Sequence, residues 1–460
     1  ISGVLEQLHL ILQTEVKLLA GVRKESEKLA DTLTLIRGVL EDAEEKQVNN
    51  EAVKQMQDTD DIIEQMKGSG EMTCLRVSDL RYNFVREVPD ETLKLNGCDS
   101  LWKLPEGIGK LHNLRHLELK RTDRLSYFPW GLERLRCLPT LSKVILDYDG
   151  GKGCQIGELN FLDRIQGEVR IQGLERVASS KHVKLKEKEK LRSLALSFSA
   201  EERQGEEESV LDGLQPHTNL AELEIQGYQG NKFPSWMMST NTALPNLVTL
   251  SLVDCNQCSE LPALGRLQYL ETLYLSGLDS VKRIGYEFYG LGSTDSVVVF
   301  PKLHTFTIRS MKECEEWHLP FPRDVEIFPK LRKLTVAKFM SLQMLPPGLG
   351  KLKSLEQVSL YGVKFQGPEL FRIITRNSDD GNVTLSAHES VFPVLKKLEL
   401  FDMPDWVEQE CEIRRDEEVE GFIMPGLCKL EISHCLKLKV VPHYLFSLAL
   451  TSLKIWDCHN

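Results

Sequence analysis

The sequence lacks the features that would mark a membrane protein or a common hydrolase. No apolar run in its 460 residues approaches the roughly 18 that a membrane-crossing helix needs, so we expect no integral membrane span. It also contains no H-E-x-x-H and no G-x-S-x-G sequence, and its 11 histidines are scattered along the chain. We therefore predict no catalytic residues and no enzyme activity.

The sequence also has no intact phosphate-binding loop, whose form is G-x-x-x-x-G-K-[ST]. In that loop the backbone amides and the lysine hold phosphates, while the hydroxyl binds Mg²⁺. The two nearest matches, Gly109-Lys110-Leu111 and Gly350-Lys351-Leu352, carry leucine at the hydroxyl position and lack the upstream glycine. We predict that this chain binds no cofactor, and in particular neither ATP nor ADP.

Cysteine is present, but without the spacing of a metal site. There are 11 cysteines, and no second C-x-x-C or H-x(3–5)-H follows Cys255-x-x-Cys258, so we predict no metal ligands. The odd number favours reduced thiols and a cytoplasmic protein. Four cysteines share one position of the repeat, three residues after an apolar strand residue, where a small side chain fits a turn: Cys98, Cys255, Cys435 and Cys458.

Positive charge is in the minority. The chain has 57 Lys and Arg against 68 Asp and Glu, a formal net charge of −11, so we expect no general nucleic-acid binding. Two stretches, residues 201–209 and 408–420, are strongly acidic. We interpret both as solvated insertions, and the alternative is a docking site for a basic partner.

What the sequence does contain is a repeated unit, shown most clearly by residues 93–119. Two apolar residues separated by one residue are followed by a turn and then by apolar residues at intervals of three, and such a unit cannot bury its apolar edge alone. Most copies are 23–33 residues apart, with a spacing of 18 before Leu93 and of 40 before Leu398. The apolar pairs are Leu75/Val77, Leu93/Leu95, Leu117/Leu119, Val144/Leu146, Val169/Ile171, Leu194/Leu196, Leu223/Ile225, Leu250/Leu252, Leu273/Leu275, Phe306/Ile308, Leu334/Val336, Val358/Leu360, Leu398/Leu400, Leu430/Ile432 and Leu453/Ile455.

These repeats predict an α/β repeat solenoid, a leucine-rich-repeat horseshoe with a concave parallel sheet, over residues 72–460. The paired apolar residues should be buried, as we expect for Leu117, Leu223, Leu250, Leu334 and Leu398. The residues beside them should face the concave side, where aromatic and Arg side chains are frequent anchors of protein interfaces. We select as candidate concave-face contacts Tyr274, Arg309, Tyr361 and Trp456.

Residues 1–67 follow a helical period. Leu5, Leu8, Leu12 and Val16 recur at steps of 3–4 residues, a second such stretch covers residues 29–43, and a shorter one covers residues 51–67. Three amphipathic helices should form a small, partial coiled-coil bundle. A Gly-Ser-Gly sequence ends the pattern, so we expect a linker at residues 68–71.

Longer strings resemble one family. Residues 36–54, IRGVLEDAEEKQVNNEAVK, and 60–64, DDIIE, resemble the Rx-type coiled-coil domain of plant intracellular disease-resistance receptors. Residues 104–119, 210–237 and 261–290 resemble the leucine-rich repeats of the same coiled-coil/nucleotide-binding/leucine-rich-repeat family (RGA-like). That family has a nucleotide-binding domain between these parts, whereas here the repeats begin almost directly after residue 67. The resemblance therefore implies a chain lacking that domain, with ATP or ADP expected only if the full gene contains it.

The resemblance also implies an intramolecular contact, because the family's acidic motif docks on basic residues of its repeat domain. The connection between the two parts is about ten residues and reaches about 35 Å at most, which permits contact with the nearest strands. The alternative is a solvated acidic face. The candidate docking residues are Asp60, Asp61, Glu64, Arg76, Lys94 and Lys120.

The function that the resemblance implies is plant defence. The repeats would bind a pathogen effector or a host guardee protein, and the helical region would contact signalling partners. The chain would be a truncated immune receptor without its nucleotide switch. The alternative is a structural or adaptor repeat protein, a decayed receptor fragment with no signalling.

Overall fold

The computed structural model describes residues 78–79, 92–97, 104, 108–147, 151–199, 206–238, 243–291, 298–320, 325–342, 344–346, 348–364, 392–406, 424–441 and 445–458. The expected helical region, the linker, the acidic stretch 408–420 and the apolar pair Leu75/Val77 lie outside these residues. The chain divides into two compact units, Ile1–Val177 (unit 1) and Ala178–Asn460 (unit 2).

Unit 1 contains two sets of parallel strands. The first set pairs in the order β1 (Ser78–Asp79), β2 (Thr92–Lys94), β3 (His116–Glu118) and β4 (Thr140–Leu141). In the second, β5 (Lys143–Ile145) pairs with β6 (Gly167–Gln172). Short 3₁₀ helices lie on the return paths between strands: η1 (Ile108–Lys110), η2 (Leu132–Arg134), η3 (Ile156–Phe161) and η4 (Leu174–Arg176).

The register of the first strand in unit 1 differs from the prediction. Leu93 lies opposite Leu117, as the apolar pairs require. On its other side, however, Leu93 lies opposite Ser78, three residues beyond the predicted Leu75. A strand of two residues carries too few alternating side chains for its pattern to determine the register, which backbone hydrogen bonds set instead.

The repeat at residues 140–146 also differs from the prediction. Leu117 lies opposite Leu141, not Val144, and Val144 lies opposite Ile171, not Val169. The strand of this repeat is divided into β4 and β5, and the two parts pair with different neighbours. The predicted register of this repeat was therefore wrong by three residues relative to β3 and by two residues relative to β6.

Ser142 explains this division. It stands between β4 and β5, and its side-chain hydroxyl accepts a hydrogen bond from the backbone N–H of Leu119 at 2.7 Å. A side chain thus takes the place of a backbone carbonyl in the ladder, so the strand is interrupted in the manner of a bulge. The next residue, Lys143, is buried and donates from Nζ to the carbonyl of Thr122 at 2.9 Å.

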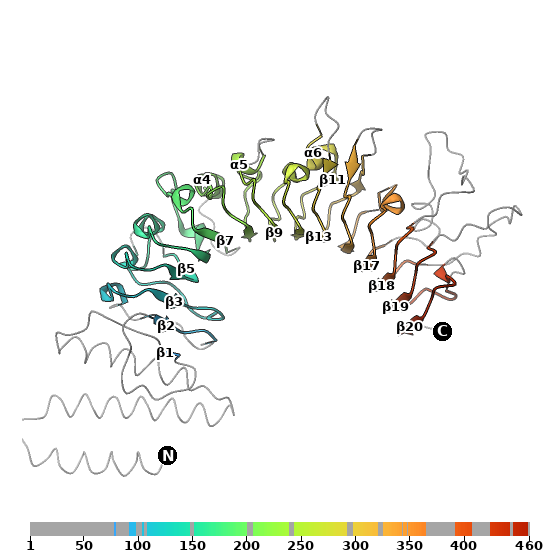
Figure 1. Cartoon of the computed structure of the whole chain (residues 1–460), viewed down its shortest axis with the longest axis horizontal. Coiled ribbons are helices and arrows are strands. Elements are labelled where there is room, and N and C mark those ends of the chain that lie inside the picture. The colour runs from blue at the N-terminus through green and yellow to red at the C-terminus, as the bar shows by residue number, and fades with distance from the viewer. Residues whose placement is uncertain are drawn as a thin grey trace, which may run out of the picture. The chain divides into compact units, whose positions relative to one another are not determined.

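Unit 2 is a regular stack of parallel strands on the inner side of a curve (Figure 1). From Leu194 opposite Leu223 to Leu430 opposite Leu453, every predicted apolar pair lies opposite the next one. The strands pair in the order β7 (Leu191–Ser197), β8 (Glu222–Gln226), β9 (Thr249–Val253), β10 (Thr272–Ser276), β13 (Thr305–Met311), β16 (Lys333–Phe339), β17 (Gln357–Tyr361), β18 (Lys397–Phe401), β19 (Lys429–Ser433) and β20 (Ser452–Trp456).

The return paths of unit 2 lie on the outer side of the curve (Figure 1). They include two short parallel pairs, β11 (Arg283–Ile284) with β14 (Glu316–Trp317), and β12 (Val298–Val299) with β15 (Glu326–Ile327). The helices on these paths are η5 (Leu185–Glu187), α4 (Glu207–Gly213), α5 (Ser235–Met238), η6 (Leu264–Arg266), α6 (Tyr286–Tyr289) and η7 (Leu349–Lys351). All are too short to cross a membrane, and no described helix is long and apolar enough to do so.

The core lies between the strands and these return paths. The five leucines predicted to be buried, from Leu117 to Leu398, are all 4% exposed or less. A cluster of aromatic rings joins neighbouring repeats in the middle of unit 2, where Phe300 and Phe328 stack at 5.0 Å. The prediction of an α/β leucine-rich-repeat solenoid with a concave parallel sheet is confirmed.

The turns that follow the inner strands from β8 to β20 use left-handed backbone. The residue after the last inward position has positive φ in successive repeats, for example Asp254 (54°), Gly277 (65°) and Asp402 (49°). Glycine is required at 277, because a Cβ there would lie 2.9 Å from the backbone Cα of Asp254. This conformation turns the chain out of the sheet at the same point in each of these repeats.

The cysteines at this turn have the structural role that their spacing predicts. Cys255 and Cys435 are buried, and each thiol lies 3.9 Å from a strand carbonyl of the preceding repeat, Ile225 and Leu400 respectively. Burial raises the pKa of both thiols to about 12, so they are protonated at neutral pH. Cys458 is a free, half-buried thiol.

Candidate protein-binding surface

The strands from β13 to β20 present three rows of side chains on the inner face of unit 2, each row crossing six strands at the same register. The first row is Thr305, Lys333, Gln357, Lys397, Lys429 and Ser452. The middle row is Thr307, Thr335, Ser359, Glu399, Glu431 and Lys454. The third row is Arg309, Ala337, Tyr361, Phe401, Ser433 and Trp456.

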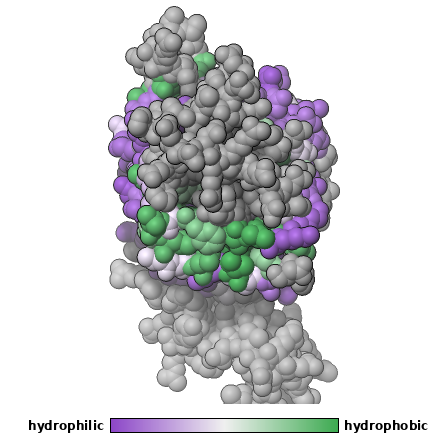
Figure 2. Space-filling view, turned by 90° about the vertical axis from the view of Figure 1, so that its right-hand side faces the viewer, coloured by the Kyte–Doolittle hydropathy of each residue, from purple (hydrophilic) through white to green (hydrophobic). Residues whose placement is uncertain are grey.

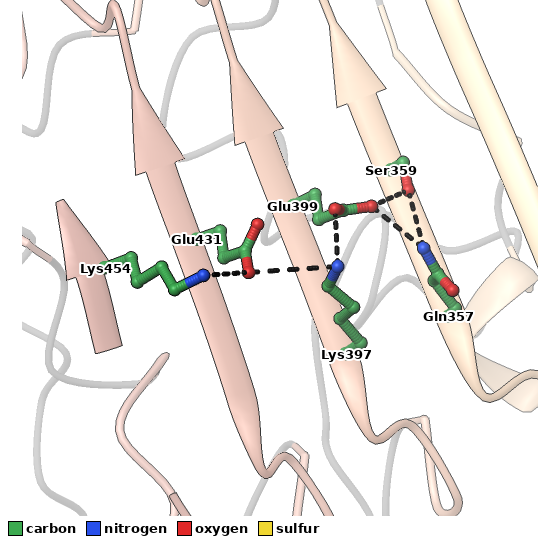
Figure 3. Close-up of polar contacts among 6 residues, drawn as sticks. All are labelled: Gln357, Ser359, Lys397, Glu399, Glu431 and Lys454. Atoms are coloured by element: carbon green, nitrogen blue, oxygen red, sulfur yellow. Dashed lines mark hydrogen bonds and ion pairs between the residues drawn. The ribbon is translucent and has the colours of Figure 1, made fainter. Parts of the chain in front are cut away.

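Hydrogen bonds and ion pairs connect the first and middle rows (Figure 3). The carboxylate of Glu399 accepts hydrogen bonds from the hydroxyl of Ser359 and, at 2.9 Å, from Nε2 of Gln357. Its other oxygen lies 2.7 Å from Nζ of Lys397. The same Lys397 lies 3.8 Å from the carboxylate of Glu431, which in turn lies 3.4 Å from Nζ of Lys454.

This network stabilises the charged forms of Glu399 and Lys397. Burial on its own would raise the pKa of Glu399, but the hydrogen bonds from Lys397, Ser359 and Gln357 outweigh it and hold the pKa below its usual range. The hydrogen bond with Glu399 raises the pKa of Lys397. Two ammonium groups therefore face two carboxylates, and their charges cancel within the network.

Half of the third row is aromatic. The rings of Tyr361 and Phe401 stack at 4.8 Å between centroids and 6° between planes. Trp456 lies 5.8 Å from Phe401 and is tilted by 58°, with only Ser433 on the strand between them. Trp456 is 39% exposed, and Tyr361 and Phe401 are half-buried, so all three rings present apolar surface to solvent.

Arg309 is the one charged residue of the third row. It lies two strands from Tyr361, separated from it by the small side chain of Ala337. Its side chain is half-buried, and the guanidinium has no hydrogen-bond or ion-pair partner among the residues that the structure describes. The row therefore places an unpaired cation beside an aromatic surface.

Apolar side chains also gather at the last repeat. Figure 2, which looks onto this end of unit 2, shows apolar residues side by side on its surface. The core-facing positions of β20, Leu453 and Ile455, are 44% and 45% exposed. The other exposed large apolar residues of this part are Leu436, Val440, Phe446, Leu448 and Trp456.

Three of the four predicted concave-face contacts share the third row: Arg309, Tyr361 and Trp456. Tyr274 lies apart from them, in the register of the middle row between Ser251 and Thr307. Sequence reasoning missed Phe401, although it stands directly after the second apolar residue of its repeat, as Tyr361 does. That shared position is the signal that would have identified it.

Of the predicted docking residues, Asp60, Asp61, Glu64 and Arg76 lie outside the described residues. The other two already have acidic partners within unit 1. Lys94 lies 3.2 Å from Glu118, and Lys120 forms an ion pair with Glu168. Burial tends to raise the pKa of Glu118, but hydrogen bonds from Asn96 and Lys94 outweigh it and lower the pKa.

The composition of the acidic stretch 201–209 predicts a solvated insertion, and the structure contradicts this for its last residues. Its last residues enter helix α4, and Glu207 is buried. The carboxylate of Glu207 accepts the backbone N–H of Gln229 at 2.7 Å, and that of Glu208 accepts the N–H of Asn231 at 2.7 Å. These carboxylates join one repeat to the next, which composition does not reveal.

Two sequence families match the chain. The family described as R13L1/DRL21 LRRs matches residues 156–278, and the Rx N-terminal domain matches residues 1–65. The predicted resemblance, an Rx-type N-terminal region followed by leucine-rich repeats, is confirmed by these two matches. The first of them covers strands β7 to β10 and ends before the three rows described above.

Curated relatives are plant proteins named for disease resistance. RPP13-like protein 1 of Arabidopsis thaliana is 30% identical over 317 residues, which are 63% of this chain and 29% of that protein. Disease resistance protein RGA2 of Solanum bulbocastanum is 34% identical over 230 residues, which are 48% of this chain and 20% of that protein. RGA1 of the same species is 29% identical over 282 residues, or 60% and 27%. The chain thus spans less than a third of each relative.

Among solved structures, a plant peptide hormone receptor, RGFR1 in complex with RGF2, matches 77% of this chain and 76% of its own. The identity is 14% and the TM-score is 0.22, so the two shapes do not superpose closely.

Proposed function

We propose that this chain, a homologue of the RPP13-like and RGA disease resistance proteins, is a defence-related recognition protein that binds other proteins through the inner face of its repeats. The partner would be a pathogen effector or a host guardee protein, and the Rx-type region would contact signalling partners. We place its action in the cytoplasm and assign it no enzyme activity, no cofactor and no nucleic-acid partner. The boundaries of the helical domain (1–67), linker (68–71) and repeat domain (72–460) stay predictions.

The observation that carries the proposal is the third row. Tyr, Trp and Arg are the residues most enriched among those that dominate binding energy in protein interfaces, and here all three types lie in one row. The adjacent middle row is charged, but its carboxylates Glu399 and Glu431 are paired with Lys397 of the first row and with Lys454, so a partner that covers them leaves neither carboxylate unpaired. An aromatic row beside a satisfied polar row has the composition of a protein interface.

A double variant, Tyr361→Ala with Phe401→Ala, tests the proposal. The parent chain is screened for direct binding against purified pathogen effectors and host proteins, and each interaction found is measured again with the variant. We expect affinity to fall at least tenfold, because both stacked rings are lost. The matched control is Tyr269→Ala, which removes an exposed ring on the return path after η6. Interactions that tolerate the double variant, or that fail equally with the control, would refute a binding role for this face.

The alternative function is a structural or adaptor repeat protein without signalling. It is favoured by the sequence itself, which passes from residue 67 to the repeats without a phosphate-binding loop. Expression of the chain in leaves, with and without a partner found in the screen, distinguishes the two. A defence response that needs both proteins supports recognition, and binding with no response supports the adaptor.

The contact between the acidic motif and the repeats also stays a prediction. Lys94 already pairs with Glu118, so docking would have to share or displace that ion pair. In the full chain, Asp60→Lys with Asp61→Lys should lower the melting temperature at low salt only, because exposed ion pairs are screened. Arg76→Glu added to that variant should restore part of the loss. A melting temperature indifferent to both changes would favour a solvated acidic face.

A further inference from the structure

We infer that the third row binds a partner segment in the polyproline II conformation that carries an acidic side chain three residues away from an aromatic one. The acidic group would pair with Arg309, and the aromatic ring would contact the stacked pair Tyr361 and Phe401. The inference rests on the proposed function, because it names the chemistry of the segment that the same face would bind.

The first anchor is Arg309. Its neighbours in the row are Ser276 on β10 and Ala337 on β16, both small and both buried, so neither places a large side chain beside the guanidinium. It has no acidic partner among the described residues, in contrast to Lys397 and Lys454. A guanidinium offers two parallel N–H donors that match a carboxylate, so an acidic side chain is the group that satisfies it best.

The second anchor is the ring pair. Tyr361 and Phe401 lie almost parallel, and Trp456 closes the far end of the row at an angle of 58° to Phe401. Aromatic side chains add favourably to such a pair in offset or edge-to-face arrangements. The site therefore favours Trp, Tyr or Phe over a small or charged side chain.

The register gives the distance between the two anchors. Arg309 pairs with Ala337, and Ala337 pairs with Tyr361, so the anchors are two strand steps apart. Adjacent strands are about 4.8 Å apart, which makes the separation about 10 Å. A chain in the polyproline II conformation has three residues per turn and advances about 3.1 Å per residue, so side chains three residues apart point the same way and lie about 9 Å apart. The acidic and aromatic residues of the partner should therefore be separated by two others.

The middle row explains why the partner segment should be acidic and not basic. Glu399 already accepts hydrogen bonds from Gln357 and Ser359 and pairs with Lys397. Glu431 already faces two ammonium groups. A basic side chain of the partner would have to compete with Lys397 and Lys454 for Glu399 and Glu431. A carboxylate of the partner can pair with Arg309, which has no acidic partner among the described residues.

The test uses the full chain and a phage-displayed library of random twelve-residue peptides. Enriched sequences are then made as acetylated, amidated peptides without terminal charges, and their affinities are measured by fluorescence anisotropy. We expect Asp or Glu three positions from Trp, Tyr or Phe. Arg309→Gln should weaken these peptides about tenfold, as the loss of a charged hydrogen-bonded pair does. Selection on Arg309→Glu should instead enrich Lys or Arg at the acidic position.

The matched control is Arg283→Glu, which reverses a charge on β11, on the outer side of unit 2. It should leave both the selected sequences and their affinities unchanged. Peptides that lose affinity with Tyr361→Ala but not with Arg309→Glu would overturn this inference and leave the proposed binding face intact. Peptides indifferent to both variants, or no enrichment on the parent, would overturn both.

Discussion

Phe401 and Trp456 lie on strands that do not pair with each other, yet their ring centroids are 5.8 Å apart. The strand between them carries Ser433 at the same register, and this small side chain leaves room for the tilted indole to reach across. With Tyr361 stacked on the other side of Phe401, the aromatic surface extends over four strands, β17 to β20. A larger residue at position 433 would divide it.

The same apolar position of the repeat should contribute much more to the free energy of unfolding in the middle of unit 2 than in its last repeat. Leu250 is fully buried, whereas Leu453, at the equivalent position of β20, is 44% exposed. Leu250→Ala should lower the free energy of unfolding by about 2–5 kcal/mol, because it removes buried methyl groups and leaves a cavity. Leu453→Ala should cost less than about 1 kcal/mol. Urea unfolding of both variants measures the difference, and equal costs would mean that the register is wrong.

The stability of the divided strand in unit 1, β4 and β5, should depend on the hydroxyl of Ser142. Ser142→Ala leaves the buried N–H of Leu119 without its acceptor, which should lower the free energy of unfolding by about 1–3 kcal/mol. Ser354→Ala is the control, since its hydroxyl donates to the carbonyl of Leu331 and its loss leaves no N–H unpaired. Thermal unfolding compares the two. A Ser142→Ala cost no larger than that of the control would contradict this role.

The regular part of the fold could be predicted from sequence because each repeat of unit 2 carries one unambiguous apolar pair. The prediction failed at residues 141–146 because all six are buried, so alternation between the two faces is absent there. Leu141, Val144 and Leu146 are then equally plausible strand residues. Which one pairs depends on the hydroxyl of Ser142, and apolar spacing carries no information about it.

The candidate surface was predictable in part for a similar reason. Residue type and repeat position identify Tyr361, Trp456 and Arg309, and repeat position alone would have added Phe401. The ion pairs of the middle row were not predictable, because Lys397 reaches sideways to Glu431 on the next strand as well as to Glu399 on its own. That choice depends on side-chain conformations, which sequence spacing does not specify.

The network around Glu399 should stabilise unit 2 except in acid. The pKa of Glu399 is lowered in the folded chain, so its contribution is complete above the unfolded pKa, near 4.5, and is lost as the pH falls through the folded pKa. Glu399→Gln should cost about 1–3 kcal/mol at pH 7, because it removes charge-assisted hydrogen bonds, and progressively less below pH 4.5. Urea unfolding from pH 3 to 7 measures this. The control, Glu356→Gln, breaks an exposed ion pair with Lys396 and should cost at most about 1 kcal/mol.

Unit 1 should show the opposite pH dependence through Glu158. This buried carboxyl accepts backbone N–H groups of Gly131 at 3.0 Å and Gln155 at 2.9 Å, and burial together with the neighbouring Glu133 raises its pKa to about 7. The folded chain therefore binds a proton that the unfolded chain releases near pH 4.5. The stabilisation is complete below pH 4.5 and declines as the pH rises to about 7, by roughly 3 kcal/mol in all. Glu158→Gln mimics the protonated group, so its stability relative to the parent should rise over that interval, whereas the exposed control Glu187→Gln should show no such change. Unfolding measured from pH 4 to 8 decides the matter, and a difference between Glu158→Gln and parent that is independent of pH would show that Glu158 does not titrate there.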